Sequence, residues 1–296
     1  YRKDVHGFLP EMMQKIYDER VQSKKLMLIA KQEYEKAPST ELEKAISKYN
    51  NIQMARKIQL NSAYGAIGNQ YFRYYNLTNA EAITLSGQTS IRWIENKVNG
   101  YLNKLLNTSK KDYVIASDTD SIYLCLNELV TKVYGDKDVS QEKIVNFLDK
   151  ACKEKIEPFI DRSYQELAHY TNAYEQKMFM KRENIASRGI WTAKKRYILN
   201  VWDSEGVRYA NPKLKMMGIE AVKSSTPAPC RTAIKDALNI MMTGEQDDLL
   251  SFIDKFRDEF NSMPPEDIAF PRSVNGLRKF KSDTDVYSKG CPLHVR

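Results

Sequence analysis

Apolar positions recur at helical spacing through most of the chain. A long polar helix is predicted over residues 10–36, and the break Ala37-Pro38-Ser39 separates it from a second helix that ends near Tyr64-Gly65. Ser39 and the acidic residues after it are typical of a helix start, so we expect two antiparallel helices joined by a short connection. Further helices are predicted over residues 78–106, 141–170, 230–243 and 245–261.

Two segments instead have an extended, β-branched pattern. One is the apolar run at residues 113–124, and the other is Tyr197–Trp202, which Asp203-Ser204-Glu205-Gly206 turns back. The helices and the predicted sheet together place the chain in the α+β class, with the sheet between helical ends.

The net charge of the chain indicates the kind of partner that it binds. The chain has 296 residues, a formal charge of +8 and a pI near 9.0, so nucleic acid is the first expectation for a partner. No 18-residue apolar span is present, which argues against a membrane.

The four cysteines are far apart and there are only three histidines, so neither a zinc site nor a disulfide framework is expected, and a reducing cytoplasm fits. The start at Tyr1 without a signal peptide suggests a fragment.

Two carboxylates interrupt the apolar run at residues 113–124. If Asp118, Thr119 and Asp120 all lie in an extended strand, both carboxylates point to one face. Such a pair repels itself unless a cation lies beside it, and Mg²⁺ together with substrate phosphates suits these oxygen ligands. The alternative is a tight β-hairpin turn, which these residue types also favour. Both interpretations can hold, because a hairpin turn also presents carboxylates to a ligand.

The same tetrapeptide recurs as Ser282-Asp283-Thr284-Asp285, without a flanking apolar run. We therefore interpret residues 282–285 as an exposed loop.

Basic residues gather in two further places. Lys57, Asn61 and Tyr64 share one stripe of the second helix, and an antiparallel hairpin would bring Arg20 and Lys24 of the first helix toward them, around a polyphosphate. Ordinary solvated helix surface is the alternative. The run Lys194-Lys195-Arg196-Tyr197 comes directly before an apolar strand, where alternating side chains favour phosphate or groove contacts over a merely charged strand entrance.

The order of these motifs resembles that of family B DNA polymerases. Residues 57–65, Lys-Ile-Gln-Leu-Asn-Ser-Ala-Tyr-Gly, resemble the fingers motif, Asp118-Thr119-Asp120-Ser121 the palm carboxylate motif, and Lys194-Lys195-Arg196-Tyr197 the primer-template motif. The segments at residues 72–75, 193–197 and 223–227 look most like the replicative polymerases of large tailed bacteriophages. The resemblance extends over essentially the whole chain.

This resemblance implies a domain organisation and a role for each site residue. Residues 1–69 would be helical-hairpin fingers, residues 70–218 an antiparallel-sheet palm with packed helices, and residues 219–296 a partial helical thumb. The resemblance assigns the metal ligands as Asp118 and Asp120, the phosphate-binding residues as Arg20, Lys24, Lys57 and Asn61, the residue beside the nascent base pair as Tyr64, and the residues that grip the duplex as Lys194, Lys195, Arg196 and Tyr197.

The implied function is template-directed transfer of deoxynucleotides to a primer 3′-hydroxyl by a two-Mg²⁺ mechanism in the cytoplasm of an infected bacterium. The implied partners are primer-template DNA, dNTP and an upstream polymerase half, since no segment resembling the family's upstream palm aspartate motif precedes Tyr1. A sliding clamp is not expected to bind through these residues. Ala116-Ser117 replace the Tyr-Gly that is common before the family's carboxylates, which affects primer positioning. The alternative function is a catalytically silent DNA-binding fragment.

Overall fold

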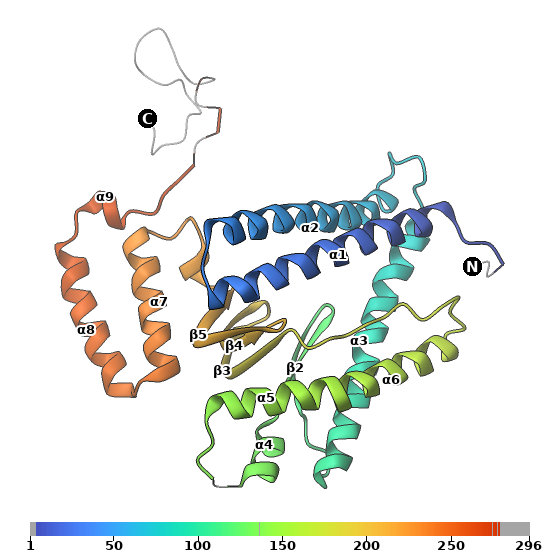
Figure 1. The fold of residues 1–296 in the computed structure, drawn as a ribbon. Coiled ribbons are helices and arrows are strands. Elements are labelled where there is room, and N and C mark those ends of the chain that lie inside the picture. Colours follow the sequence, from blue (N-terminus) through green and yellow to red (C-terminus); the bar gives the residue numbers. More distant parts are fainter. Residues whose placement is uncertain (1–3, 136, 274, 277, 279–296) are drawn as a thin grey trace. The chain divides into compact units, whose positions relative to one another are not determined.

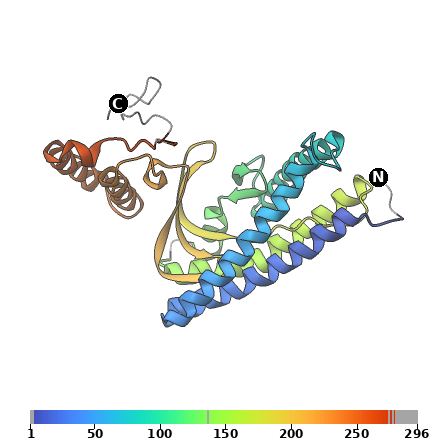
Figure 2. The ribbon, with the colours of Figure 1, turned by 90° about the horizontal axis from the view of Figure 1, so that it is seen from above.

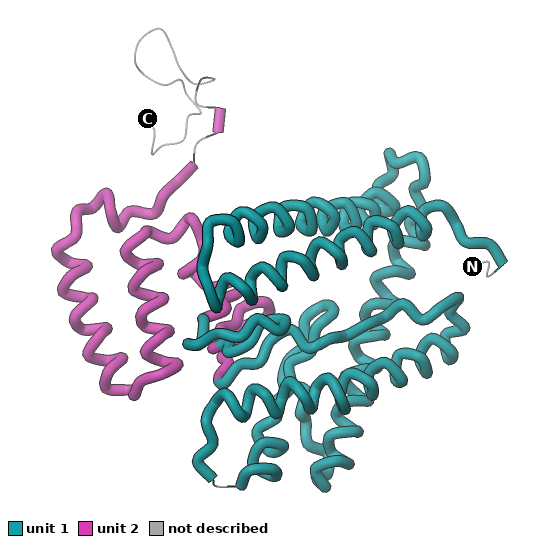
Figure 3. Tube along the Cα trace, viewed as in Figure 1, with its two compact units in different colours: residues 1–187, 201–213 teal, residues 188–200, 214–296 magenta. Residues whose placement is uncertain are grey.

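The computed structural model describes residues 4–135, 137–273, 275–276 and 278. The described residues divide into two compact units, one within residues 1–187 and 201–213 and the other within residues 188–200 and 214–296 (Figure 3). The boundary passes through three strands, so each unit contains part of β3, β4 and β5. The predicted loop at residues 282–285 lies outside the described residues.

Unit 1 begins with the predicted helical hairpin. Helices α1 (Phe8–Lys36) and α2 (Thr40–Ile67) pack against each other and are joined at residues 37–39 (Figures 1 and 2). The hydroxyl of Ser39 accepts a hydrogen bond from the Leu42 amide at 3.2 Å, which confirms Ser39 as the N-cap of α2. An ion pair between Arg56 and Glu19, at 2.8 Å, joins the two helices.

Helix α3 (Leu77–Leu106) supports the first β-hairpin. Strands β1 (Val114–Asp118) and β2 (Ser121–Leu124) pair antiparallel, and Asn99 of α3 anchors the start of β1 by accepting hydrogen bonds from the amides of Tyr113 at 2.8 Å and Val114 at 3.0 Å. A buried apolar cluster joins this hairpin to α3 and α6 through Ile94, Val98, Leu102, Leu106, Tyr113, Val114, Cys152, Ile156, Ile160, Tyr164 and Leu167.

The helix predicted over residues 141–170 is made of three parts. These are α5 (Gln141–Ala151), a π-helical turn at Cys152–Ile156 and α6 (Glu157–Tyr170). Pro158 lacks a backbone N–H, so the usual i to i−4 bond is missing there, which accounts for the irregular turn just before it. The pattern did not predict the short helix α4 (Asn127–Tyr134).

The second sheet has the order β3-β4-β5, from strands β3 (Asn184–Ala193), β4 (Arg196–Ser204) and β5 (Val207–Met217). Unit 2 continues with a 3₁₀ turn at Glu220–Val222 and helices α7 (Ala228–Thr243), α8 (Gln246–Ser262) and α9 (Pro265–Ile268). Its core contains Ile198, Ile219, Ala221, Leu238 and Met242. The α+β class is therefore confirmed.

Within the described residues, no helix is both long enough and apolar enough to span a membrane. The division into fingers, palm and thumb assigns roles to segments, and it stays a prediction.

Candidate active site

The two carboxylates of the apolar run lie at the tip of the β1–β2 hairpin. Asp118 pairs with Ser121 across the hairpin, so Thr119 and Asp120 form a two-residue turn. Thr119 has φ of 56°, and the amide of Asp120 donates to the carbonyl of Asp118 at 2.6 Å. The predicted extended strand through Asp118, Thr119 and Asp120 is therefore wrong, and the hairpin turn that was its alternative is confirmed. The left-handed backbone at Thr119 ends the alternation of faces.

Both carboxylates remain accessible in the turn. Asp118 is half-buried and accepts a hydrogen bond from the Thr119 hydroxyl at 3.0 Å, whereas Asp120 is exposed. The hydroxyl of Ser121 donates to the Asp118 carbonyl at 3.1 Å, which closes the turn. The tip thus presents two hard oxygen donors to solvent.

The β1–β2 hairpin packs on the buried apolar cluster. Tyr164 of α6 is buried in the core cluster, and burial together with the negative charge of Asp120 raises the pKa of Tyr164 to about 12. Among the described residues, no group of three or more His, Cys, Asp or Glu side chains forms a metal-binding cluster.

The five residues predicted to bind nucleotide lie along the α1–α2 hairpin. Lys57, Asn61 and Tyr64 are exposed on α2 and follow one another at i, i+4 and i+7. Arg20 of α1 is half-buried, and its Nε atom is buried without a hydrogen-bond partner among the described residues. Lys24 forms an ion pair with Glu205.

A shallow apolar groove of about 370 Å³ runs between the two helices beside these residues. It is lined from α1 by Leu9, Met12, Met13 and Ile16 and from α2 by Ile58, Gln59, Ser62, Ala63 and Ala66, with Phe72 beyond α2. The groove confirms that α1 and α2 run antiparallel, because low residue numbers on α1 face high numbers on α2.

The basic run at residues 194–197 lies at the second hairpin, in unit 2. Lys194 and Lys195 form the turn between β3 and β4, and β4 begins at Arg196. The expected alternation of all four side chains across the sheet is therefore wrong for the two lysines, because Lys195 has φ of 61°. Arg196 forms an ion pair with Glu220, and Tyr197 is buried beside Trp191 with 6.4 Å between ring centroids.

Gly218 supports the turn at residues 194–195. Its φ is +67°, and a β-carbon at this position would clash with the carbonyl oxygen of Lys195. Only glycine allows this close approach, so Gly218 sets the position of the Lys194–Lys195 turn.

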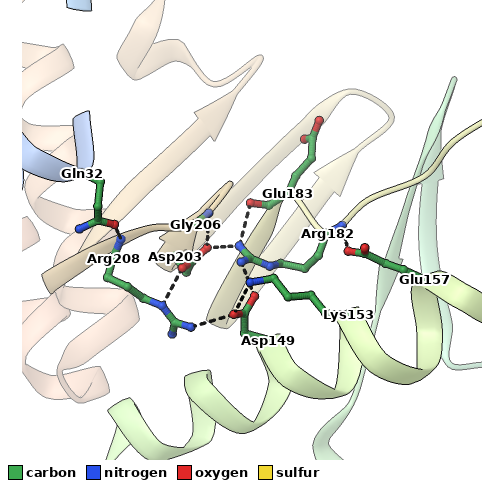
Figure 4. A network of polar contacts seen from close by, with 9 residues as sticks. All are labelled: Gln32, Asp149, Lys153, Glu157, Arg182, Glu183, Asp203, Gly206 and Arg208. Carbon is green, nitrogen blue, oxygen red and sulfur yellow. Dashed lines mark hydrogen bonds and ion pairs between the residues drawn. The ribbon is translucent and has the colours of Figure 1, made fainter. Parts of the chain in front are cut away.

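The pattern did not predict the buried polar network of unit 1 (Figure 4). Asp203 is fully buried and forms ion pairs with Arg182 and with Arg208, the latter at 2.8 Å. Asp149 of α5 lies 2.5 Å from Arg182 and 3.4 Å from Arg208. Burial raises the pKa of Asp149, but hydrogen bonds from Lys153 and Arg182 outweigh burial and hold this pKa below its usual value.

Only the turn signal at residues 203–206 pointed toward this network, and it did not indicate burial. Unit 1 therefore brings the carboxylate turn and the five hairpin residues into one compact body, whereas Lys194–Tyr197 belong to unit 2.

The fold and the carboxylate turn define an α+β protein with a helical hairpin and an acidic β-hairpin. A model of DNA polymerase family B matches residues 2–273. The chain is 40% identical over 264 residues to the DNA-directed DNA polymerase of Enterobacteria phage T4, covering 86% of this chain and 29% of that protein. It is 43% identical over 252 residues to the polymerase of Escherichia phage RB69, covering 82% and 28%. A DNA polymerase of Pyrococcus glycovorans is 24% identical over 285 residues, covering 95% and 30%.

The chain belongs to DNA polymerase family B. This confirms the resemblance stated from the sequence motifs. The chain spans less than a third of the length of these curated relatives.

Proposed function

We propose that this chain is the part of a template-directed DNA polymerase that holds the incoming deoxynucleotide and two of the metal-binding carboxylates. The observation that carries the proposal is the β1–β2 turn, which presents Asp118 and Asp120 to solvent above a packed helical base in a chain of polymerase family B. The reaction is transfer of a deoxynucleotide to a primer 3′-hydroxyl, with primer-template DNA and dNTP as substrates. It takes place in the cytoplasm of an infected bacterium.

The donor set of the turn fits Mg²⁺. Magnesium in nucleotide enzymes is commonly held by one or two carboxylates together with substrate phosphates, and the turn offers two carboxylates one residue apart. Two Mg²⁺ ions would lower the pKa of the primer hydroxyl and stabilise the leaving pyrophosphate. We propose that polymerase sequence outside these 296 residues supplies a further carboxylate and completes the palm.

The residues of the α1–α2 hairpin bind the substrate rather than the metal. Arg20, Lys24 and Lys57 supply cationic hydrogen-bond donors and Asn61 a neutral donor for the triphosphate, since charge-assisted bonds to phosphate oxygens are the strong ones. Tyr64 is 42% exposed, so its ring is available to pack beside the nascent base pair. These contacts orient the α-phosphate toward the primer and exclude water when the hairpin closes.

The turn at residues 194–195 and the start of β4 bind the newly formed duplex. Lys194 and Lys195 are exposed in the turn, where they serve as phosphate contacts. Arg196 is fixed by Glu220, and Tyr197 is a buried anchor for the strand. Positively charged contacts of this kind confer an affinity for DNA that falls with salt.

Metal binding in the presence of dNTP tests the assignment directly. We expect Mn²⁺, titrated by electron paramagnetic resonance with dATP present, to bind the wild-type chain and to bind the Asp120→Asn variant at least tenfold more weakly. The matched control is Asp285→Asn, which makes the same change in the second Ser-Asp-Thr-Asp tetrapeptide and should leave Mn²⁺ binding unchanged. Equal loss in both variants would contradict the assignment.

Primer extension supplies the functional readout. The chain supplemented with an upstream palm segment should extend a primer, and Asp120→Asn should abolish extension while duplex binding stays intact or becomes slightly stronger, because a negative charge near DNA is removed. If both pieces fold and associate but do not extend a primer, the chain is the silent DNA-binding fragment instead.

A further inference from the structure

Lys24, one of the proposed triphosphate ligands, already has an anionic partner. Its amine forms an ion pair with the carboxylate of Glu205, which lies in the turn between β4 and β5, and both residues belong to unit 1. The two side chains are only 31% and 24% exposed, so solvent screens this pair less than it screens an open surface pair. A triphosphate that binds Lys24 must therefore replace a carboxylate.

The turn that carries Glu205 is a two-residue β-hairpin turn that hydrogen bonds hold in place. Glu205 has φ of 53° and Gly206 has φ of 92°, as expected for the two central residues of a tight β-hairpin turn. The Glu205 amide donates to the Glu183 carbonyl at 2.5 Å, and buried Asp203 accepts from the Gly206 amide at 3.0 Å. These two bonds hold the backbone of Glu205 in one position, and with it the start of the side chain that pairs with Lys24.

Helix α1 is held along the same hairpin by two further contacts. Gln32 accepts a hydrogen bond from the Arg208 amide at 3.1 Å (Figure 4), and Glu35 forms an ion pair with Lys213 at 2.5 Å. Gln32 follows Lys24 by eight residues and Glu35 follows Gln32 by three, so all three side chains share one face of the helix. The meeting of Lys24 with Glu205 is thus set by the docking of α1 and is not a chance contact of two long side chains.

We propose that Glu205 is a positioning residue that holds Lys24 as its counter-ion until a triphosphate displaces the carboxylate. This inference rests on the proposed function of Lys24. Before nucleotide binds, the pair keeps the amine ordered and neutralised. A single weakly charged anion competes poorly with the carboxylate, whereas a triphosphate with its several negative charges competes well. Glu205 therefore lowers the overall nucleotide affinity and favours polyphosphates over other anions.

Nucleotide titration of charge-matched variants tests this role. Glu205→Gln should bind dATP about two- to fivefold more tightly than wild type, as the loss of one partly exposed ion pair implies. The gain should vanish when Lys24→Ala is added, because the competing pair no longer exists. The control is Glu35→Gln, which removes the carboxylate paired with Lys213 between the same helix and the same hairpin and should leave dATP affinity unchanged.

A chemical readout reports on the pair itself without nucleotide. The acylation rate of the Lys24 amine, measured by mass spectrometry with Lys213 as internal reference, should rise in Glu205→Gln. An unchanged rate would refute the pairing, and a raised rate with unchanged or weaker dATP binding would refute the counter-ion role. Failure of the proposed function looks different, because Lys57→Ala and Lys24→Ala would then both leave dATP affinity unaltered.

Discussion

Removing the charge of Asp203 should cost this protein considerable stability. Its side chain is completely buried, forms ion pairs with Arg182 and Arg208, and accepts a hydrogen bond from the Gly206 amide at 3.0 Å. Asp203→Asn preserves the shape and leaves an oxygen for the Gly206 amide, but it removes the charge. The two guanidinium groups then share Asp149 as their only carboxylate in the network that Figure 4 shows.

The burial of the partners sets the size of the effect. The Arg182 side chain is 7% exposed and cannot turn to water, whereas that of Arg208 is 33% exposed and is partly solvated. Removing one member of a buried ion pair typically costs about 3 to 5 kcal/mol. Because Arg208 retains some solvent, we expect the lower end, about 3 kcal/mol. The exposed Lys213–Glu35 pair should contribute less than about 1 kcal/mol.

Urea unfolding followed by circular dichroism measures this difference, with Glu35→Gln as the control. Hydrogen exchange of the peptide covering residues 201–213 then shows whether the loss is local to unit 1. If Asp203→Asn costs no more free energy of unfolding than Glu35→Gln, the network is not the stabilising centre that its burial implies.

The same network should respond to acid. The pKa of Asp149 is lowered in the folded protein, so the unfolded chain binds the proton more tightly. The stability contributed by Asp149 is therefore fully present above the ordinary aspartate pKa of about 3.9 and is lost as pH falls through the lowered value. Asp149→Asn should flatten the acid side of a stability-against-pH curve, and an identical acid side in both proteins would contradict the pKa direction.

Two further predictions concern glycine and cysteine positions. Gly218→Ala should weaken duplex binding, measured by gel shift, because its β-carbon clashes with the backbone of the lysine turn. Gly100→Ala, at an exposed helical position toward the C-terminal end of α3 with open space around it, should raise the free energy of unfolding in a urea titration by about 0.5 to 1 kcal/mol. Equal duplex binding by both variants would exclude the clash. Burial raises the pKa of the Cys152 thiol to about 11. Iodoacetamide at pH 8 should therefore modify half-buried Cys230 and spare Cys152 until the protein unfolds. Rapid labelling of Cys152 in the native protein, detected by mass spectrometry, would refute its burial.

Local patterns in the sequence determined most of the elements. Helical spacing and the cap at Ser39 were enough for α1 and α2, since a helix bonds only to its own neighbours along the chain. The motifs around residues 57–65, 118–121 and 194–197 were enough to identify the family, which the comparisons confirm. The roles assigned to the individual site residues remain predictions.

Tertiary structure decided the features that depend on residues far apart in the chain. The pattern left Asp120 either in an extended strand or in a hairpin turn, and the fold decided for the turn through the pairing of Asp118 with Ser121 and the backbone of Thr119. Asp203 was predicted only as a turn residue, and its burial against Arg182 became visible only in the fold. The partners Lys24 and Glu205 are 181 residues apart, and no local rule relates two charges at that separation. Periodicity describes which face of an element is buried, whereas the identity of the partner depends on how elements dock, and docking is a property of the whole folded unit.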